Sequence, residues 1–415
     1  MKITRFIKRT VSAVILCALL ASVLGCNGNI SAEDLMKDII PSQGNKGQYE
    51  GKSSEAVDFS VRLLQNTEES GKNTLISPLS VLSALAMAVN GAEGNTLAEM
   101  ENTLGVSRDE LNGFLSEYLR SLPEGEKYKL NVANSIWVAD HFNVSGDFLQ
   151  KNADNYGADI YKTPFDDSTL KDINNWVERE TDGMIKNVLD RIPANVIMYL
   201  INALAFDAEW SDIYQENQVR DGEFYPDGGG TQNVEFMHGS ENKYITDGNA
   251  EGFIKYYVGG KYAFAALLPK EGMSLSDYID TLSGEKLLNM LSNVQTVRVY
   301  NSIPKFESEY QCEMSSILAD MGIKDAFDGA AADFSGIGSS SDGNIFINRV
   351  IHKTYISVDE RGTKAGAVTM IEVNTTGADL VDEVKYVYLD RPFLYMIIDC
   401  ENNIPVFIGT LNSVK

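Results

Sequence analysis

Few side chains in this 415-residue sequence could do catalytic chemistry. It contains three histidines, His141, His238 and His352, and a lone histidine is most often a packed structural residue. No Gly-x-Ser-x-Gly elbow, His-Glu-x-x-His pair or paired Cys-x-x-Cys sequence is present, and Gly336-Ile337-Gly338 lacks the third glycine of a dinucleotide-binding loop. The sequence therefore favours a protein that is not an enzyme and that uses neither a cofactor nor a metal ion.

One segment combines the side-chain pattern of a buried strand with the glycines of a loop. Every second residue in it is uncharged: Thr363, Ala365, Ala367, Thr369, Ile371, Val373 and Thr375. This period of two is typical of a strand with one buried face. Three glycines, Gly362, Gly366 and Gly377, are instead typical of an exposed loop. We expect the segment to adopt both conformations.

Further motifs lie on both sides of this segment. Residues 352–363 read HKTYISVDERGT, 389–395 read LDRPFLY and 405–410 read PVFIGT. Towards the N-terminus, residues 76–81 read ISPLSV, 202–210 NALAFDAEW, 303–306 IPKF, 321–327 MGIKDAF and 332–337 ADFSGI. In this order, from about Ser53 to Leu411, these motifs resemble those of serpins, a family of serine protease inhibitors.

The hydrophobic periodicity predicts the elements that would position these motifs. Helices are expected at 32–40, 55–64, 81–89, 96–104 and 170–179. Strands are expected at 131–139, 196–206, 253–257, 262–268, 296–303, 345–348, 355–358, 394–398 and 406–411. Helices first and strands later indicate an α+β protein. The resemblance implies a serpin domain over residues 53–415, with about eight or nine helices around three β-sheets and an exposed reactive-centre loop at about 360–385.

The resemblance assigns roles within that loop. Its hinge would comprise Glu360, Gly362, Thr363, Ala365, Gly366, Ala367 and Thr369. The cleaved bond, after the sixteenth residue beyond Glu360, would be Thr376–Gly377. Small uncharged side chains at alternate positions suit entry into a sheet interior, where an unpaired charge costs several kcal/mol. Gly366 stands where the family has alanine, and its flexibility would slow this entry.

The resemblance also implies two groups of polar residues at the main sheet. A gate cluster, where the strands part, would consist of Ser77, Ser80, Asn202 and His352. Buried polar groups require hydrogen-bond partners, so this cluster would have one arrangement for each state of the sheet. Trp210, Lys305 and Glu360 would lie at the upper end of the opening. An ion pair between Lys305 and Glu360 would hold the hinge closed.

The first 25 residues have the pattern of a secretory signal peptide. A basic start precedes an apolar run from Val11 to Leu24, which is short for a membrane span. Gly25 before Cys26 resembles a bacterial lipobox and implies lipidation of Cys26; an ordinary signal peptide with an incidental cysteine is the alternative. Residues 26–52 would then be a flexible tether, and the protein a lipoprotein exported across the cytoplasmic membrane to the cell surface of a bacterium.

The charge of the chain limits its partners. Loss of the signal leaves 31 Lys and Arg against 59 Asp and Glu, a net charge of −28. Such acidity opposes binding to nucleic acid. Some serpins bind heparin through a basic helix, but the corresponding stretch, 107–122, holds Arg108 and Arg120 against three acidic residues. We expect a monomer that is not activated by heparin.

The sequence therefore predicts an irreversible, suicide-substrate inhibitor of serine proteases. The protease would attack the loop and form an acyl-enzyme, and the freed loop would enter the main sheet as a strand. No Lys, Arg or aromatic residue lies between Ala365 and Val384, which favours an elastase-like target; a subtilisin-like or cysteine protease is the alternative. A non-inhibitory serpin that serves as a surface binding or carrier protein is the alternative function.

Overall fold

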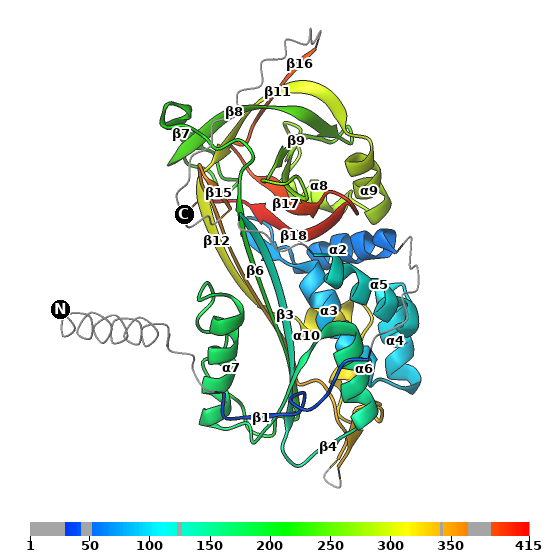
Figure 1. The fold of residues 1–415 in the computed structure, drawn as a ribbon. Coiled ribbons are helices and arrows are strands. Elements are labelled where there is room, and N and C mark those ends of the chain that lie inside the picture. The colour runs from blue at the N-terminus through cyan, green and yellow to red at the C-terminus, as the bar shows by residue number, and fades with distance from the viewer. Residues whose placement is uncertain (1–29, 43–51, 123–126, 341–342, 364–382, 415) are drawn as a thin grey trace, which may run out of the picture.

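The structure, a computed structural model, describes residues 30–42, 52–122, 127–340, 343–363 and 383–414 (Figure 1). Nine α-helices and three β-sheets lie within these ranges. The α+β class and the predicted number of helices and sheets are thereby confirmed.

One half of the molecule is built on a seven-stranded sheet. Its order is β1 (Glu33–Asp34), β5 (Asp159–Thr163), β3 (Tyr128–Ala139), β6 (Met198–Glu209), β15 (Gly362–Thr363), β14 (Arg349–Val358) and β12 (Phe306–Glu313). Strands β3 and β6 are antiparallel along most of their length, whereas β6 and β14 are parallel. The two-residue strand β15 lies between β6 and β14, so part of the predicted reactive-centre loop already belongs to this sheet.

A nine-stranded sheet forms the other half of the molecule. Its order is β16 (Val384–Tyr388), β11 (Gln295–Pro304), β8 (Gln232–Thr246), β9 (Ala250–Tyr256), β10 (Tyr262–Pro269), β17 (Phe393–Asp399), β18 (Ile404–Leu411) and β2 (Thr74–Ile76), with β7 (Val219–Phe224) paired to β8. Every residue of β10, β17 and β18 is buried. A third sheet pairs β4 (Asn143–Val144) with β13 (Gly338–Ser339). Strand β16 is an edge strand, and it follows the loop directly in the chain.

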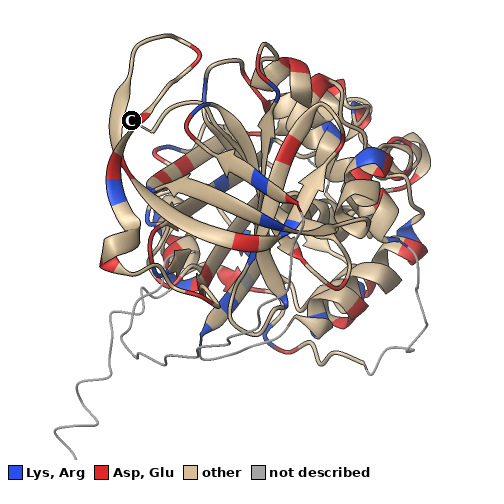
Figure 2. Cartoon of the chain, turned by 90° about the horizontal axis from the view of Figure 1, so that it is seen from above, with Lys and Arg blue, Asp and Glu red and all other residues tan. Residues whose placement is uncertain are grey.

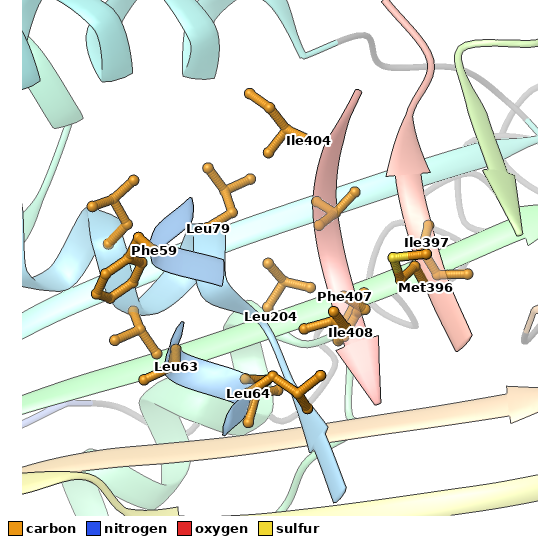
Figure 3. Close-up of a cluster of buried hydrophobic side chains, with 14 of the residues drawn as sticks. Phe59, Leu63, Leu64, Leu79, Leu204, Met396, Ile397, Ile404, Phe407 and Ile408 are labelled. Atoms are coloured by element: carbon orange, nitrogen blue, oxygen red, sulfur yellow. The ribbon is translucent and has the colours of Figure 1, made fainter. Parts of the chain in front are cut away.

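Two helices join the sheets through the core. All residues of α3 (Pro78–Val89) are buried, as expected for a helix that is apolar all round. Helix α2 (Ser53–Thr67) contacts strand β18, and its Phe59, Leu63 and Leu64 belong to the same buried cluster as Phe407 and Ile408 (Figure 3). The packing of these two helices therefore holds the junction between β2 and α3 beside β14.

Seven further helices cover the sheets: α4 (Gly94–Leu104), α5 (Arg108–Ser121), α6 (Gly146–Tyr156), α7 (Asp167–Glu180), α8 (Leu275–Asp280), α9 (Gly284–Ser292) and α10 (Ser315–Asp320). The strand expected at 345–348 is absent, and these residues have no regular secondary structure, although the Asn348 backbone N–H donates to the Met198 carbonyl of β6 at 3.0 Å. The buried Ile345 and Ile347 explain the alternating pattern that suggested a strand. The Asn348 carboxamide oxygen instead accepts hydrogen bonds from the backbone of Ile197 and Met198, at 2.7 and 3.1 Å.

The N-terminal residues 30–42 lie against the domain. No helix forms at 32–40; strand β1 pairs with β5 instead. One Asp172 carboxylate oxygen on α7 accepts hydrogen bonds from Ser31 N, Ser31 Oγ and Ala32 N at 2.7–2.9 Å. This part of the expected tether is thus bound to the sheet edge. None of the described helices is long and apolar enough to cross a membrane.

Candidate functional site

The seam between β6 and β14 is where the loop meets the main sheet. The two strands pair in parallel from Tyr199 opposite Arg349 to Leu204 opposite Thr354. Beyond this point they no longer pair with each other, and β15 lies between them. Gly362 pairs with Glu209 of β6. The seam between β6 and β14 is therefore closed where these strands pair with each other and open at the end that holds β15.

The two residues of β15 fit this opening closely. A Cβ atom on Gly362 would stand 2.0 Å from the Ala208 carbonyl oxygen, so only glycine allows the approach to β6. Thr363 has no exposed surface and pairs with both Ala208 and Val358. Its hydroxyl lies 2.5 Å from that of Tyr257. The first small residue of the alternating pattern is therefore already packed inside the sheet.

Trp210 holds the turn that precedes β15. Its backbone N–H donates to the Arg361 carbonyl and its indole N–H to the Asp359 carbonyl, both at 2.8 Å. The Tyr214 N–H donates to the Glu360 carbonyl at 2.9 Å. Three successive carbonyls of the turn thus have fixed partners. Trp210 therefore lies beside β15, at the end of the seam where β6 and β14 no longer pair.

Lys305 and Glu360 lie at the same end. The Lys305 ammonium is 2.9 Å from a Glu360 carboxylate oxygen and 3.1 Å from one of Glu235. Burial alone would raise the pKa of Glu360, but Lys305 outweighs it and the net pKa lies below its ordinary value. The expected ion pair is present, with Glu235 as an additional partner that the sequence gave no reason to name.

The gate cluster centres on His352, which is fully buried. Its Nε2 accepts a hydrogen bond from the Ser77 backbone N–H at 3.0 Å, so the ring proton resides on Nδ1. Nδ1 then donates to the Asn202 carboxamide oxygen at 2.6 Å. Burial lowers the pKa of His352 to about 3, and the ring is therefore neutral near pH 7.

The remaining gate residues extend this cluster on both sides. The Asn202 amide donates to the Asn134 side chain on β3 at 2.7 Å. The Ser80 N–H donates to Ser77 Oγ at 3.3 Å. The Ser80 hydroxyl is buried without a hydrogen-bond partner among the described residues. All four predicted gate residues are thus brought together, and Asn134 is a fifth member.

Several predicted site residues lie outside the described part of the chain. They are Cys26, Ala365, Gly366, Ala367, Thr369, Thr376 and Gly377. The described ranges contain no group of three or more His, Cys, Asp or Glu residues placed to hold a metal ion. Asn134, Tyr214, Glu235 and Tyr257 are functional candidates that sequence reasoning missed. Tyr257 lies just beyond the end of β9, and nothing in its local sequence distinguishes it from the other buried aromatic residues.

Comparison with known proteins identifies the family. Residues 54–414 match the family model described as Serpin (serine protease inhibitor). The chain belongs to the serpin family. Among curated proteins, an uncharacterized serpin-like protein of Thermococcus kodakarensis is 31% identical over 366 residues, which cover 86% of this chain and 84% of the relative. Leukocyte elastase inhibitor A of Mus musculus is 28% identical, with coverage of 86% and 97%.

Solved serpin structures match the fold over most of its length. The thermophilic serpin tengpin in its native state has a TM-score of 0.88 and 46% identity, covering 92% of this chain and 99% of that one. Tengpin in its latent state gives a TM-score of 0.79 at 45% identity, with coverage of 90% and 100%. The arrangement in this chain is therefore more similar to the native-state structure. Serpins are generally protease inhibitors rather than catalysts, and membership of this family supports a protease as the partner of this chain.

Proposed function

We propose that this serpin inhibits serine proteases irreversibly, by inserting its cleaved loop between β6 and β14. The observation that carries the proposal is strand β15. Two loop residues already pair with β6 in the main sheet, at the open end of the seam. The continuing residues have alternate uncharged side chains and so match the same pattern of burial.

Insertion is favoured by the hydrogen bonds that it creates. The closed part of the seam is a single ladder of six residue pairs, Tyr199–Leu204 with Arg349–Thr354. A strand entering there breaks one ladder and forms two, one with each neighbour. Each net hydrogen bond contributes about 1 kcal/mol, and burial of Ile371 and Val373 adds roughly 1.5–3 kcal/mol apiece. The uncleaved protein is then a kinetically trapped state.

The gate cluster suits this opening because one of its hydrogen bonds crosses the seam. His352 and Asn202 are opposite each other in the parallel pair, and their side-chain contact must break when a strand passes between them. His352 then still accepts the hydrogen bond from the Ser77 N–H, and the Asn202 amide still donates its hydrogen bond to Asn134. Neither buried polar group loses all its partners, which limits the cost of opening.

The chemistry belongs to the protease. Its nucleophile attacks the carbonyl carbon of Thr376, the bond to Gly377 breaks, and the loop's N-terminal side remains attached as an acyl-enzyme. Insertion then draws the bound protease away and distorts its active site before water can release the ester. The uncharged loop sequence, together with the similarity to a leukocyte elastase inhibitor, supports an elastase-like target.

We further propose that the protein is a bacterial surface lipoprotein. Cleavage after Gly25 and lipidation of Cys26 would anchor it outside the cytoplasmic membrane. The support is the basic and apolar pattern of the first 25 residues. Mass spectrometry of the membrane fraction checks this directly, since the expected N-terminal peptide begins at a lipid-modified Cys26 and an unmodified one contradicts the proposal.

A denaturing gel after mixing with pancreatic elastase tests the inhibitory function. The expected result is a band at the summed mass of protease and serpin fragment. Cleavage of the loop without that band contradicts the proposal and supports the alternative, a non-inhibitory serpin that binds or carries a ligand. Thyroxine-binding globulin, solved with thyroxine at a TM-score of 0.77 and 25% identity over 88% of this chain and 99% of that one, shows that the fold also serves a binding protein.

A further inference from the structure

Exposed apolar side chains are concentrated on the edge of the nine-stranded sheet. Among the described residues, four of the six large exposed ones lie there, on β11 and β16: Tyr300, Val384, Tyr386 and Tyr388. Their exposed fractions are 39%, 39%, 59% and 43%. These four residues are called the tyrosine surface below. A contiguous group of this kind marks a binding site more often than scattered apolar residues do.

The strand geometry holds these side chains in place. In β16 the exposed residues alternate with Lys385 and with Val387, which is fully buried and anchors the strand. Tyr300 stands opposite Tyr386 in the parallel pair, and their rings stack with centroids 5.7 Å apart. The ring centroids of Tyr386 and Tyr388 are 6.3 Å apart. Rigid tyrosines offer a large contact area at a low cost in conformational entropy.

Stabilisation of the edge strand accounts for only part of this arrangement. A stacked cross-strand pair does strengthen the attachment of β16 to β11, and Tyr300 with Tyr386 serves that purpose. Tyr388 and Val384 lie outside the pair and remain open to solvent. The nearby charge is locally balanced, because the Lys385 ammonium lies 2.6 Å from a Glu383 carboxylate oxygen. Figure 2, which views the molecule from this end, shows basic and acidic residues interspersed.

The length of the loop places a protease beside this surface. Six residues lie between Gly377 and Val384, and the seven steps from one Cα atom to the other span at most about 25 Å when fully extended. A protease domain of about 230 residues has a radius of gyration of about 17 Å and hence a diameter of roughly 45 Å. A body of that size, with Thr376–Gly377 in its active site, is held within about 25 Å of Val384, close enough to contact the end of the molecule that carries β16 (Figure 1).

We propose that the tyrosine surface binds the body of the target protease while the reactive bond occupies its active site. The inference rests on the proposed function, since it takes the loop as the bait. The complementary protease surface is uncharged and apolar, and it borders the active-site cleft on the side that receives residues after the cleaved bond. Contact there orients the protease before acylation and increases the rate of capture.

The test uses pancreatic elastase whose catalytic serine is replaced by alanine, so that binding is measured without cleavage or insertion. The full-length serpin is compared with a Tyr386→Ala, Tyr388→Ala double variant by calorimetry. The expected result is about a tenfold weaker affinity for the variant and a similar loss in the rate of covalent capture by active elastase. Tyr386→Phe should keep wild-type affinity, because the ring supplies the contact.

Two controls separate this surface from folding and from inhibition itself. Ile40→Ala removes another exposed apolar side chain, close to β1 at the opposite end of the molecule, and should change neither quantity. Thermal denaturation confirms that the double variant folds.

If no covalent band forms with the wild type, the proposed function fails. The affinity for inactive elastase still shows whether the tyrosine surface binds the protease. Equal affinities overturn the inference, as does no binding by the wild type. A dimer that the double variant abolishes would assign the surface to a second copy of this chain and also overturn it.

Discussion

His352 illustrates how one buried side chain can connect three elements. Its ring joins β14 to Asn202 on β6 and to the residue that precedes α3. Both ring nitrogens are used in the neutral form, and a second ring proton would remove the acceptor that Ser77 N–H requires. Protonation of His352 therefore opposes the closed seam.

We expect stability to fall in acid because of His352. In the unfolded chain a histidine binds a proton below about pH 6.5, whereas folded His352 does so only below about 3. Between these values unfolding takes up a proton, and the free energy of unfolding falls as pH falls, by up to about 1.4 kcal/mol per pH unit. Chemical denaturation from pH 7 to 4 measures this, and His352→Gln should show a shallower slope. Equal slopes in the two proteins would contradict the prediction.

At the scale of elements, β15 is the part of the loop that already lies in the sheet. The proposed insertion would therefore begin where β6 and β14 are already apart, and not at the gate cluster. Thr363 occupies a space bounded by β6, β14 and Tyr257. That space accepts a small side chain and has no room for a charged one.

Thr363→Arg should abolish trapping and leave cleavage intact. Arginine would bury an unpaired charge at a cost of several kcal/mol, so the hinge stays outside the sheet while the bond at Thr376 remains accessible. Densitometry of gels with active elastase gives the ratio of covalent complex to cleaved serpin, which should fall at least tenfold. Thr363→Ser, which keeps the hydroxyl for Tyr257, is the matched control and should trap normally. Complex formation by the arginine variant at the wild-type ratio would refute insertion at this position.

Sequence patterns predicted several of the long elements but not all of them, since helix α5, of 14 residues, and strand β8, of 15 residues, were not expected. The periodicity of α2, α3, α7, β3 and β6 was readable because each spans several repeats. Short helices such as α8 and α10 provide barely two turns, and 345–348 alternates for reasons of burial alone. The gate and hinge contacts join residues up to 275 positions apart, so only the family resemblance placed them. Tyr257 and Asn134 act through tertiary packing, for which no local signal exists.

For the whole molecule, the uncleaved fold is expected to be less stable than the cleaved one. Cleavage frees a strand to complete the seven-stranded sheet, and the added ladders must be broken on unfolding. The melting temperature after loop cleavage should therefore rise by at least 10 °C, a gain of several kcal/mol. Differential scanning fluorimetry before and after limited proteolysis measures the change. An unchanged melting temperature would mean that the loop does not insert.

The hydrogen bonds from Ser31 and Ala32 to Asp172 set how far the anchored protein could stand from a bilayer. With a lipid on Cys26, only four residues would separate the anchor from this attachment, a reach of about 18 Å at most. The end that carries β1 and α7 would then rest near the headgroups, and the end that carries β16 would point outward (Figure 1). An approaching protease would then reach the reactive-centre loop, which leads into β16, before the rest of the molecule. The rest of the molecule would lie between the protease and the membrane.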